Sequence, residues 1–328
     1  MTDRPKPGEF ELIRRHFAPL ATSPGAFQLS DDAAVLPAPQ GQDLVFTADA
    51  LIAGVHFLAT DPPDLVARKL IRVNLSDLAA MGARALGYLL TAAWPPSADE
   101  DWIAGFASGL AVDQKQFDIA LLGGDTVSTS GSIALSLTAI GAVAEGAALR
   151  RSGARVGDRL FLTGSLGDGA LGLLAARGEL SGADADDITY LQGRYRLPEP
   201  RTSVGPRLVA LASAAIDVSD GLVADAGHLA ETSGVTVRVE RSALPLSPAA
   251  ARRVHAAPQH WSLVLGGGDD YELLFSAPPS ARGQIAEIAV ETGVPIAEIG
   301  AIAEGEGVCV LAEDGSPVKL PEAGWQHF

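Results

Sequence analysis

The segment AAIDVSDGLVADAGHLAETSGVTVRV, residues 214–239, sets the fold class of this chain. Its opening AAIDV is apolar around one aspartate and predicts a short buried strand over 214–218. Apolar residues then recur at helical spacing at 222, 223, 226, 229 and 230, which predicts a helix over about 220–232, capped by Ser219 and ended by Gly234. Residues 235–239 predict a second strand. This succession of strand, helix and strand indicates mixed α/β layers.

The same mixture of elements recurs along the rest of the chain. Helical spacing predicts helices over 8–18, 65–81 and 100–113. Apolar runs predict strands over 33–36, 44–48, 119–122, 132–141, 159–163 and 271–276. Periodicity is lost in the segment EGAALRRSGARVGD, residues 145–158, where we place a domain boundary. We therefore expect an α/β (α+β) protein with two mixed domains, residues 1–148 and 149–328.

Composition limits the possible partners. The 328 residues, 47% of them hydrophobic, are typical of two domains, and a formal net charge of −16 argues against nucleic acid or an anionic membrane surface. The single cysteine, Cys309, allows neither an intrachain disulfide nor a cysteine-rich zinc site. The N-terminus lacks the apolar core of a signal peptide, and the longest apolar run, residues 133–144, is too short to span a bilayer. We expect a cytoplasmic protein.

Seven aspartates lie in apolar, glycine-punctuated segments where predicted strands give way to turns or helices. They are Asp31 and Asp32 in LSDDAAVL, Asp49 in FTADAL, Asp77 in VNLSDLAAMGA, Asp125 in LLGGDTV, and Asp217 and Asp220 in AAIDVSDGL. An ionised carboxylate in apolar surroundings is unfavourable unless it is paired, and Lys and Arg are nearly absent from these segments. Mg²⁺ takes oxygen ligands and keeps waters and substrate phosphates in its shell. The pattern predicts a magnesium scaffold for a phosphate substrate.

Several of these positions also have a plain structural interpretation. Asp220 could cap its own helix, and Asp125 could suit a Gly-Gly-Asp turn. Residues 164–169, GSLGDG, are favoured as a tight strand-to-helix turn, because their spacing is wrong for a dinucleotide-binding loop. Residues 266–270, GGGDD, are either a flexible turn or a place where backbone approaches a substrate closely. His56 is favoured as a polar contact or core histidine over a ligand.

Taken together, the segments resemble one known family. GEFELI, SDDAAVL, TADALIAGVHF, KLIRVNLSDLAAMGA, LLGGDT, RSGARVGD, IDVSDGL and GGGDDYELLF follow in the order found in the thiamine-monophosphate kinase family. That family belongs to the superfamily of aminoimidazole ribonucleotide synthetase and selenophosphate synthetase. The resemblance covers Gly8 to Trp325. It implies phosphorylation of thiamine monophosphate by ATP, with several Mg²⁺ ions, and a homodimer in which the N-terminal metal- and ATP-binding domains pair their sheets while a C-terminal α/β sandwich domain completes the active site.

The resemblance also assigns roles residue by residue. The implied magnesium-binding residues are Asp32, Thr47, Ala48 (through its backbone), Asp49, Asp77, Asp125, Asp217 and Asp220. The implied ATP contacts are Gly124, Asp125, Arg151 and Ser219, and the implied thiamine phosphate contacts are His56, Asp269 and Trp325. Three positions depart from the family pattern: Ser30 stands where glycine is usual, Ala48 where serine or threonine is usual, and Asp269 where glutamate is common.

The chemistry of the acceptor fits this assignment. A phosphate monoester has a second pKa of about 6 and is already largely a dianion at neutral pH, so no general base has to remove a proton. We therefore expect no catalytic acid or base, and catalysis by metal-assisted alignment for direct in-line transfer. Trp325 either packs as a tail aromatic or stacks on the thiamine rings. Two alternatives stay open: a ring-closing synthetase acting on a purine precursor, and a divalent-ion-binding protein without catalysis.

Overall fold

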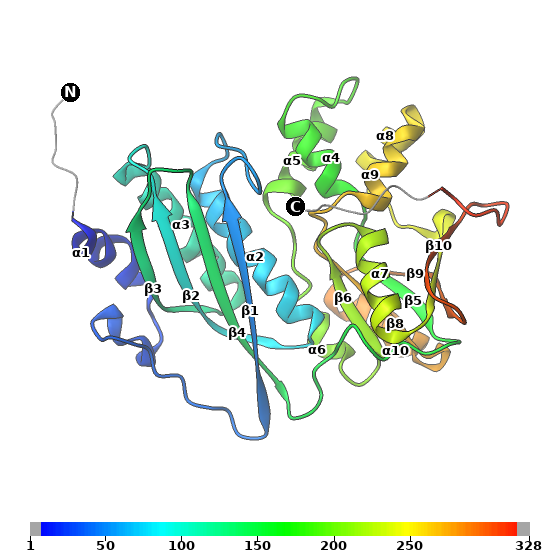
Figure 1. Ribbon diagram of the computed structural model, residues 1–328, viewed down its shortest axis with the longest axis horizontal. Coiled ribbons are helices and arrows are strands. Elements are labelled where there is room, and N and C mark those ends of the chain that lie inside the picture. Colours follow the sequence, from blue (N-terminus) through cyan, green and yellow to red (C-terminus); the bar gives the residue numbers. More distant parts are fainter. Residues whose placement is uncertain (1–7, 320–328) are drawn as a thin grey trace. The chain divides into compact units, whose positions relative to one another are not determined.

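The computed structural model describes residues 8–319 and folds them into two compact units (Figure 1). Within that range the first unit comprises residues 8–78 and 84–144, and the second comprises residues 79–83 and 145–319. The expected domain boundary, 148–149, lies close to the crossing at 144–145. Nothing in the hydrophobic pattern signals that residues 79–83, at the end of a long helix and its following turn, join the second unit.

The first unit is built on a four-stranded sheet of order β1-β4-β2-β3. The strands are β1 (Gln42–Ile52), β2 (Arg84–Trp94), β3 (Ala120–Ser128) and β4 (Ala134–Ala144). β4 runs antiparallel to β1 and to β2, whereas β2 and β3 are parallel. α2 (Pro63–Ala80) connects β1 to β2, and α3 (Glu100–Phe117) connects β2 to β3. Both helices lie on one face of the sheet (Figure 1).

The two faces of this sheet differ in burial. On β2, Tyr88 and Leu90 are buried, whereas Leu89 between them is 40% exposed. On β1, Val45 is buried and Phe46 is 61% exposed. Alternate residues of a strand point to opposite faces, so the buried set packs on the helices and the exposed set forms an apolar outer face.

The chain before β1 departs most from the prediction. Its short helices are α1 (Glu9–Leu12), the π-helix η1 (Ile13–Phe17) and the 3₁₀-helices η2 (Ala18–Leu20) and η3 (Pro24–Leu29). The strand predicted over 33–36 is absent; Val35 instead donates its backbone N–H to the carbonyl of Gly25 at 2.8 Å. Pro37 and Pro39 follow directly and have no N–H to contribute to a sheet ladder, which explains why an apolar run fails to form a strand here.

The second unit contains a six-stranded sheet of order β10-β7-β9-β5-β8-β6. All neighbouring strands are antiparallel except β10 and β7. The strands are β5 (Arg159–Thr163), β6 (Ala214–Val218), β7 (Thr236–Glu240), β8 (Glu272–Ala277), β9 (Ile296–Ala303) and β10 (Gly307–Leu311). The helices are α4 (Asp168–Ala176), α5 (Ala185–Arg196), α6 (Gly205–Leu208), α7 (Leu222–Ser233), η4 (Arg241–Ala243), α8 (Pro248–Ala256), η5 (Pro258–His260), α9 (Trp261–Gly266), η6 (Pro279–Ala281) and α10 (Arg282–Thr292).

Both faces of this sheet are covered by apolar packing. Leu160 and Leu162 of β5 belong to the cluster that includes Leu229 of α7. Phe161, between them, belongs to the opposite cluster and stacks on Phe275 of β8 at 5.3 Å between ring centroids. Burial on both faces is what an α/β sandwich requires, and the predicted mixed α/β class is confirmed. No helix in residues 8–319 is long and apolar enough to cross a membrane.

Candidate active site

Four polar residues of the first unit meet where β1 lies against α2. Thr47 and Asp49 occupy alternate positions of β1, and Asn74 and Asp77 lie one turn apart on α2. Thr47 Oγ1 donates to Asp77 Oδ2, and Asn74 Oδ1 accepts from the backbone N–H of Asp49 at 3.1 Å. Three expected magnesium ligands are thus brought together. Asn74 was not among the predicted site residues, although a fully buried asparagine within a helix is a recognisable signal.

The seven aspartates differ in exposure, which corrects the expectation that all of them lie in apolar surroundings. Asp217 is buried; Asp49, Asp77 and Asp220 are partly buried; Asp31, Asp32 and Asp125 are exposed. Apolar neighbours in sequence do not bury a side chain when they point to the other side of a strand or turn. Asp217 therefore carries the largest desolvation penalty, whereas the exposed three can meet an ion without one.

Gly124 and Asp125 lie inside β3, which continues to Ser128, whereas the sequence predicted a strand ending at residue 122. The strand passes through the double glycine because Gly124 has a φ of 154°, and a Cβ there would lie 1.7 Å from the carbonyl oxygen of Leu90 on β2. Asp125 Oδ1 accepts from the backbone N–H of Thr126 at 2.8 Å. Gly124 thus has a structural requirement of its own, apart from any contact with ATP.

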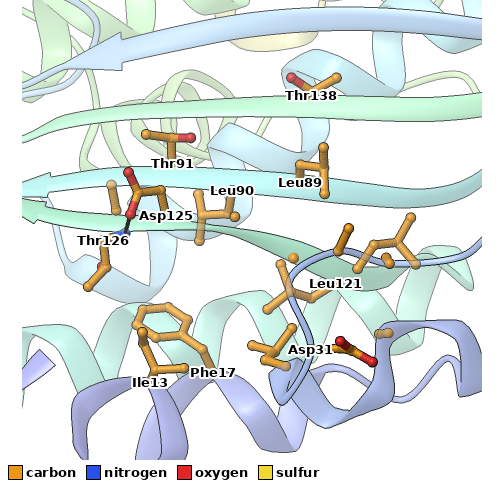
Figure 2. Close-up of a pocket in the computed structure, with 18 of the residues that line it drawn as sticks. Ile13, Phe17, Asp31, Leu89, Leu90, Thr91, Leu121, Asp125, Thr126 and Thr138 are labelled. Carbon is orange, nitrogen blue, oxygen red and sulfur yellow. Dashed lines mark hydrogen bonds between the residues drawn. The ribbon is translucent and has the colours of Figure 1, made fainter. Parts of the chain in front are cut away.

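A cavity of about 560 Å³ opens beside Asp125. In Figure 2, Ile13 and Phe17 lie below the residues of β2 and β3, such as Leu90 and Asp125, and Asp31 lies to the right of Phe17. Asp32 also contributes to the lining, and all of the lining residues belong to the first unit. A concave, largely apolar space of this size with a few polar groups is typical of small-molecule sites.

His56 closes the turn that follows β1. Its Nδ1 accepts from the backbone N–H of Ile52 at 3.0 Å, which is the polar contact favoured from the sequence. Because Nδ1 is an acceptor, the neutral ring carries its proton on Nε2. The backbone oxygen of His56 accepts from Nζ of Lys69 at 3.2 Å. Lys69 is only 2% exposed and was missed, although a lysine on the buried face of an amphipathic helix is an unusual feature.

In the second unit, Asp217, Ser219 and Asp220 lie at the end of β6. The loop before β8 approaches the same end, because the backbone N–H of Asp269 donates to the carbonyl of Ser219 at 2.9 Å. The structure therefore places Asp269, an expected thiamine phosphate contact, next to residues expected to bind ATP and magnesium. These residues come from separate parts of the sequence, and the pairing of β6 with β8 brings them together.

Helix α7 begins at Leu222, and Ser219 does not cap it, contrary to the prediction. Asp225, in the first turn, instead accepts the backbone N–H groups of Asp220 and Gly221 at 3.1 Å each through Oδ2. Burial, and secondarily the charge of Asp220, raises the pKa of Asp225 to about 7, against the effect of its backbone hydrogen bonds. Asp225 was missed; an acidic residue in the first turn that reaches back to the preceding amides is a known helix-start signal.

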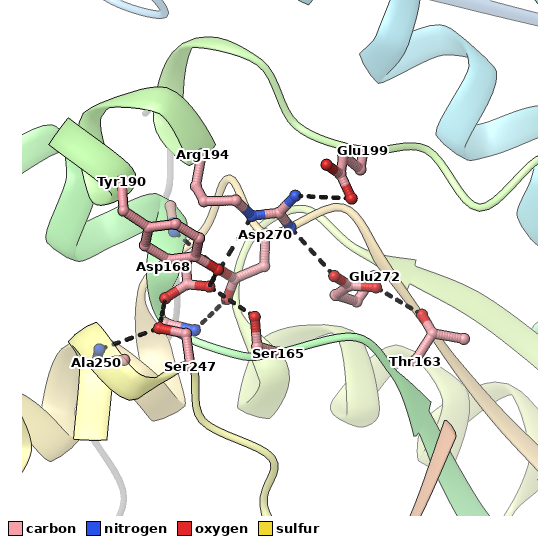
Figure 3. A network of polar contacts seen from close by, with 12 residues as sticks. Thr163, Ser165, Asp168, Tyr190, Arg194, Glu199, Ser247, Ala250, Asp270 and Glu272 are labelled. Carbon is pink, nitrogen blue, oxygen red and sulfur yellow. Dashed lines mark hydrogen bonds and ion pairs between the residues drawn. The ribbon is translucent and has the colours of Figure 1, made fainter. Parts of the chain in front are cut away.

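Residues 164–169 form the turn between β5 and α4, and the structural interpretation of GSLGDG is confirmed. Asp168, at the start of α4, is fully buried. It accepts hydrogen bonds from Ser165 at 2.6 Å, from Tyr190 at 3.0 Å and from Ser247 (Figure 3). This turn is part of a polar network that holds α4, α5 and α8 together.

Glu272, at the start of β8, is the second buried acid of this network (Figure 3). Thr163 donates to its Oε2 at 2.7 Å, and Arg194 donates to its Oε1 at 3.2 Å. Arg201 contacts both carboxylate oxygens through Nε and Nη2. The two arginines and the threonine satisfy a charge that would otherwise be unfavourable in the interior.

The remaining predicted site residues are placed as follows. Arg151 is exposed, and its backbone oxygen accepts from Ser233 Oγ at 3.2 Å. Ala48 lies at an exposed position of β1 opposite Thr138, on the face away from Thr47. A serine or threonine hydroxyl at that position would point away from Asp49 and Asp77. Trp325 lies outside the described residues.

The donor chemistry of these residues fits a hard cation. Thr47, Asn74, Asp49 and Asp77 offer hydroxyl, amide and carboxylate oxygens in the first unit, and Asp217 and Asp220 offer carboxylates at the end of β6. In residues 8–319, however, no group of three or more His, Cys, Asp or Glu side chains lies close enough to hold a metal ion. Mg²⁺ fits such an incomplete set, because it ordinarily keeps several waters and draws further ligands from substrate phosphates.

Comparison with known proteins identifies the family of this chain. Residues 30–143 match the N-terminal domain of AIR synthase related proteins, and residues 155–312 match the C-terminal domain. A thiamine-monophosphate kinase from Caulobacter vibrioides is 46% identical over 325 residues, which cover 98% of this chain and 91% of that protein. The chain belongs to the thiamine-monophosphate kinase family. The resemblance read from the sequence segments is confirmed.

Solved structures of thiamine-monophosphate kinases share the fold. The structure from Stenotrophomonas maltophilia K279a superimposes with a TM-score of 0.81 at 43% identity, covering 88% of this chain and 91% of that one. A structure described as AaThiL complexed with AMPPCP and TMP has a TM-score of 0.77 at 32% identity and covers 91% of both chains. The matched thiamine-monophosphate kinases therefore share both units with this chain.

Proposed function

We propose that this protein transfers the terminal phosphoryl group of ATP to thiamine monophosphate and so produces thiamine diphosphate. The observation that carries this proposal is family membership across both units, together with the relative described in complex with AMPPCP and TMP. The two acidic sites support it, since two phosphate-bearing substrates need cations to bring them together. The kinase names of the relatives favour this reaction over a ring-closing synthetase and over a non-catalytic ion-binding protein.

Magnesium would be held at both acidic sites. In the first unit its ligands would be Thr47, Asp49 and Asp77, with Asp32, Asp125 and the backbone of Ala48 contributing; in the second they would be Asp217 and Asp220. Bound Mg²⁺ would neutralise phosphate oxygens and reduce repulsion between donor and acceptor. The chain itself supplies the alignment, since Thr47 fixes Asp77 and Asn74 fixes the backbone of β1 at Asp49. Such preorganisation lowers the entropy lost when the substrates are aligned.

ATP would occupy the cavity beside Asp125. Its flat, largely apolar base suits the side lined by Ile13 and Phe17, and its phosphates would then extend toward Gly124 and Asp125. Arg151 and Ser219 of the second unit would contact ATP as well. This placement explains how an acidic protein binds a polyanion, because cations rather than a basic patch neutralise the phosphates.

Thiamine monophosphate would be bound by His56, Asp269 and Trp325. Its phosphate is largely a dianion at neutral pH and attacks without losing a proton, so this chain need supply no catalytic base. With Nδ1 of His56 accepting from Ile52, Nε2 carries the proton that could be donated to a substrate oxygen. Transfer would be direct, with no phosphoenzyme. ATP is the donor, in keeping with the expected cytoplasmic location.

The protein would act as a homodimer through the apolar outer face of the first sheet. Phe46 is 61% exposed on that face, and Leu44 and Ile52 are each 38% exposed on the same side of β1. Large apolar side chains gathered on one side of a sheet are typical of a surface that a partner covers. In a two-fold symmetric dimer, the same face of a second copy would cover this surface.

The direct test is a product assay. Purified protein with MgATP and thiamine monophosphate should form thiamine diphosphate, resolved by ion-exchange chromatography, and EDTA should stop the reaction. Free thiamine and an open-ring purine-precursor ribonucleotide serve as parallel substrates for the alternatives. Turnover of either of these without turnover of thiamine monophosphate would refute the proposal, and ion binding with no product from any substrate would favour the non-catalytic alternative.

A further inference from the structure

The loop that carries Asp269 has an unusual backbone. Asp269 has a φ of 68° and Tyr271 a φ of 52°, both in the left-handed region that residues with a Cβ adopt infrequently. Two such residues in one short loop persist only when the surroundings hold them there. Their backbone N–H groups donate to Ser219 at 2.9 Å and to Val218 at 2.8 Å, which fixes the loop against the end of β6.

Asp270, between these two residues, anchors the loop from its other side. It is 1% exposed, and its two carboxylate oxygens accept the backbone N–H groups of Gly167 at 2.7 Å and Gly169 at 2.9 Å. Both donors belong to the turn into α4, where N–H groups have no partner within the helix. The Asp270 carboxylate therefore ties the Asp269 loop to α4, and the two flanking amides tie it to β6.

Glycine packing leaves this loop little room to move. A Cβ on Gly268 would lie 2.1 Å from the carbonyl oxygen of Ser219, and one on Gly169 would lie 2.4 Å from that of Asp269. A Cβ on Gly221 would lie 2.7 Å from the carbonyl carbon of Gly266. Three turns thus pack backbone against backbone, and only glycine allows the approach.

We infer that Asp270 is a positioning residue for substrate binding: it holds the strained 268–271 loop so that Asp269 stands at the end of β6 beside Ser219 and Asp220. This inference rests on the proposed phosphorylation of thiamine monophosphate. Asp270 is fully buried and acts through its neighbour Asp269, so it is not itself a catalytic residue. The GGGDD segment is then neither a flexible turn nor only a place of close backbone approach, because its second aspartate fixes what the first presents.

The test compares Asp270→Asn and Asp270→Ala with Asp187→Asn. The asparagine variant would keep one acceptor oxygen, and the alanine variant would keep none. Asp187 is a matched control, since it is a buried acid of the same unit that bonds Arg252, away from this loop. We expect the KM for thiamine monophosphate to rise about tenfold in the asparagine variant and more in the alanine variant, with the KM for ATP within about twofold of wild type. The control should leave both constants unchanged.

A second readout does not depend on activity. Hydrogen exchange at the amides of residues 269 and 271 should accelerate about tenfold or more in both Asp270 variants, while the amides of β5 keep their protection. An unchanged KM for thiamine monophosphate and unchanged exchange in a folded Asp270→Ala protein would overturn the inference. So would parallel changes in both KM values that the Asp187 control reproduces. Absence of product from the wild-type protein would instead refute the proposed function. The exchange experiment would then still test whether Asp270 holds the 268–271 loop in place.

Discussion

The hydroxyl of Thr47 on β1 donates a hydrogen bond to the carboxylate of Asp77 on α2, joining the strand and helix that carry the proposed magnesium ligands. Thr47→Val keeps the shape and removes the donor, so Asp77 should lose its fixed orientation. We expect activity to fall about tenfold and the Mg²⁺ concentration for half-maximal activity to rise. Thr47→Ser keeps the hydroxyl and is the matched control. Equal Mg²⁺ dependence in the Val and Ser variants would show that the hydrogen bond has no part in metal binding.

Asp125→Asn and Asp49→Asn should lose most activity without unfolding. Asp125 is exposed and Asp49 partly buried, so exchanging carboxylate for amide removes a metal ligand while disturbing the interior little. We expect kcat/KM to fall about 100-fold or more at saturating Mg²⁺, measured by thiamine diphosphate formation, with melting temperatures close to wild type. Asp101→Asn, at an exposed position of α3, controls for loss of a surface charge. Unfolding with unchanged specific activity per folded molecule would make the carboxylates structural.

Trp325→Ala should change the affinity for one substrate only. If the indole stacks on the thiamine rings, whose thiazolium is positively charged, the contact is worth about 1–2 kcal/mol. The KM for thiamine monophosphate should then rise about tenfold and that for ATP stay near its original value. Steady-state kinetics with each substrate varied in turn would measure this. A fall in melting temperature that accounts for the loss would indicate that Trp325 packs on the protein instead.

Charged substitutions on the outer face of the first sheet should yield monomers. Phe46→Asp and Leu44→Asp place carboxylates where a partner copy would have to desolvate them. We expect sedimentation velocity at micromolar concentration to shift from a dimeric to a monomeric mass. Val290→Asp is the control, since Val290 is 83% exposed on α10 of the other unit. A monomeric wild-type protein would contradict the proposed dimer directly.

The stability contribution of Asp270 should decrease with rising pH. Burial raises the pKa of Asp270 to about 8, from an ordinary value of 3.8, and outweighs its two backbone hydrogen bonds. The folded protein then binds this proton more tightly than the unfolded chain does, so the contribution is complete below pH 3.8 and is lost as the pH rises to about 8.

Urea unfolding of the wild type and of Asp270→Asn at pH 5, 7 and 9 would isolate this contribution. The difference in unfolding free energy between the two proteins should shrink with pH by at most about 1.4 kcal/mol per unit, up to about pH 8. A difference that grows with pH would mean that the two backbone N–H groups dominate and keep Asp270 ionised.

Local patterns predicted the elements well where the chain follows a regular period. The strand over 159–163 and the strand over 214–218 were predicted with the observed bounds, because buried apolar runs between turns have few other ways to fold. The strand predicted from the apolar run at 33–36 was wrong, because the prolines that follow have no backbone N–H to donate to a neighbouring strand. The strand through Gly124 was cut short because double glycine usually marks a turn.

The candidate site was predictable in identity and less so in geometry. Asp49, Asp77, Asp217 and Asp220 were selected from their sequence context, and their role as magnesium ligands stays a prediction. The contact of Asn74 was not predicted, because only the folded chain brings the backbone amide of Asp49 near it. Asp225 bonds amides of its own turn, at Asp220 and Gly221, and could have been found from its place in the first turn of α7. Asp270 was quoted with its segment, yet its attachment to a turn about a hundred residues away depends on strand order, which periodicity does not encode.

The assignment of residues 79–83 to the second unit affects how the chain can fold while it is being synthesised. Ala79 and Ala80 pack in the core cluster that includes Phe161 and Phe275. A nascent chain that has completed only the first sheet still lacks those partners, so the end of α2 becomes buried only after residues of the second unit have been synthesised. A fragment that stops at Ala144 would keep its own sheet and expose an unsatisfied apolar end, which makes this protein a poor candidate for dissection into independent halves.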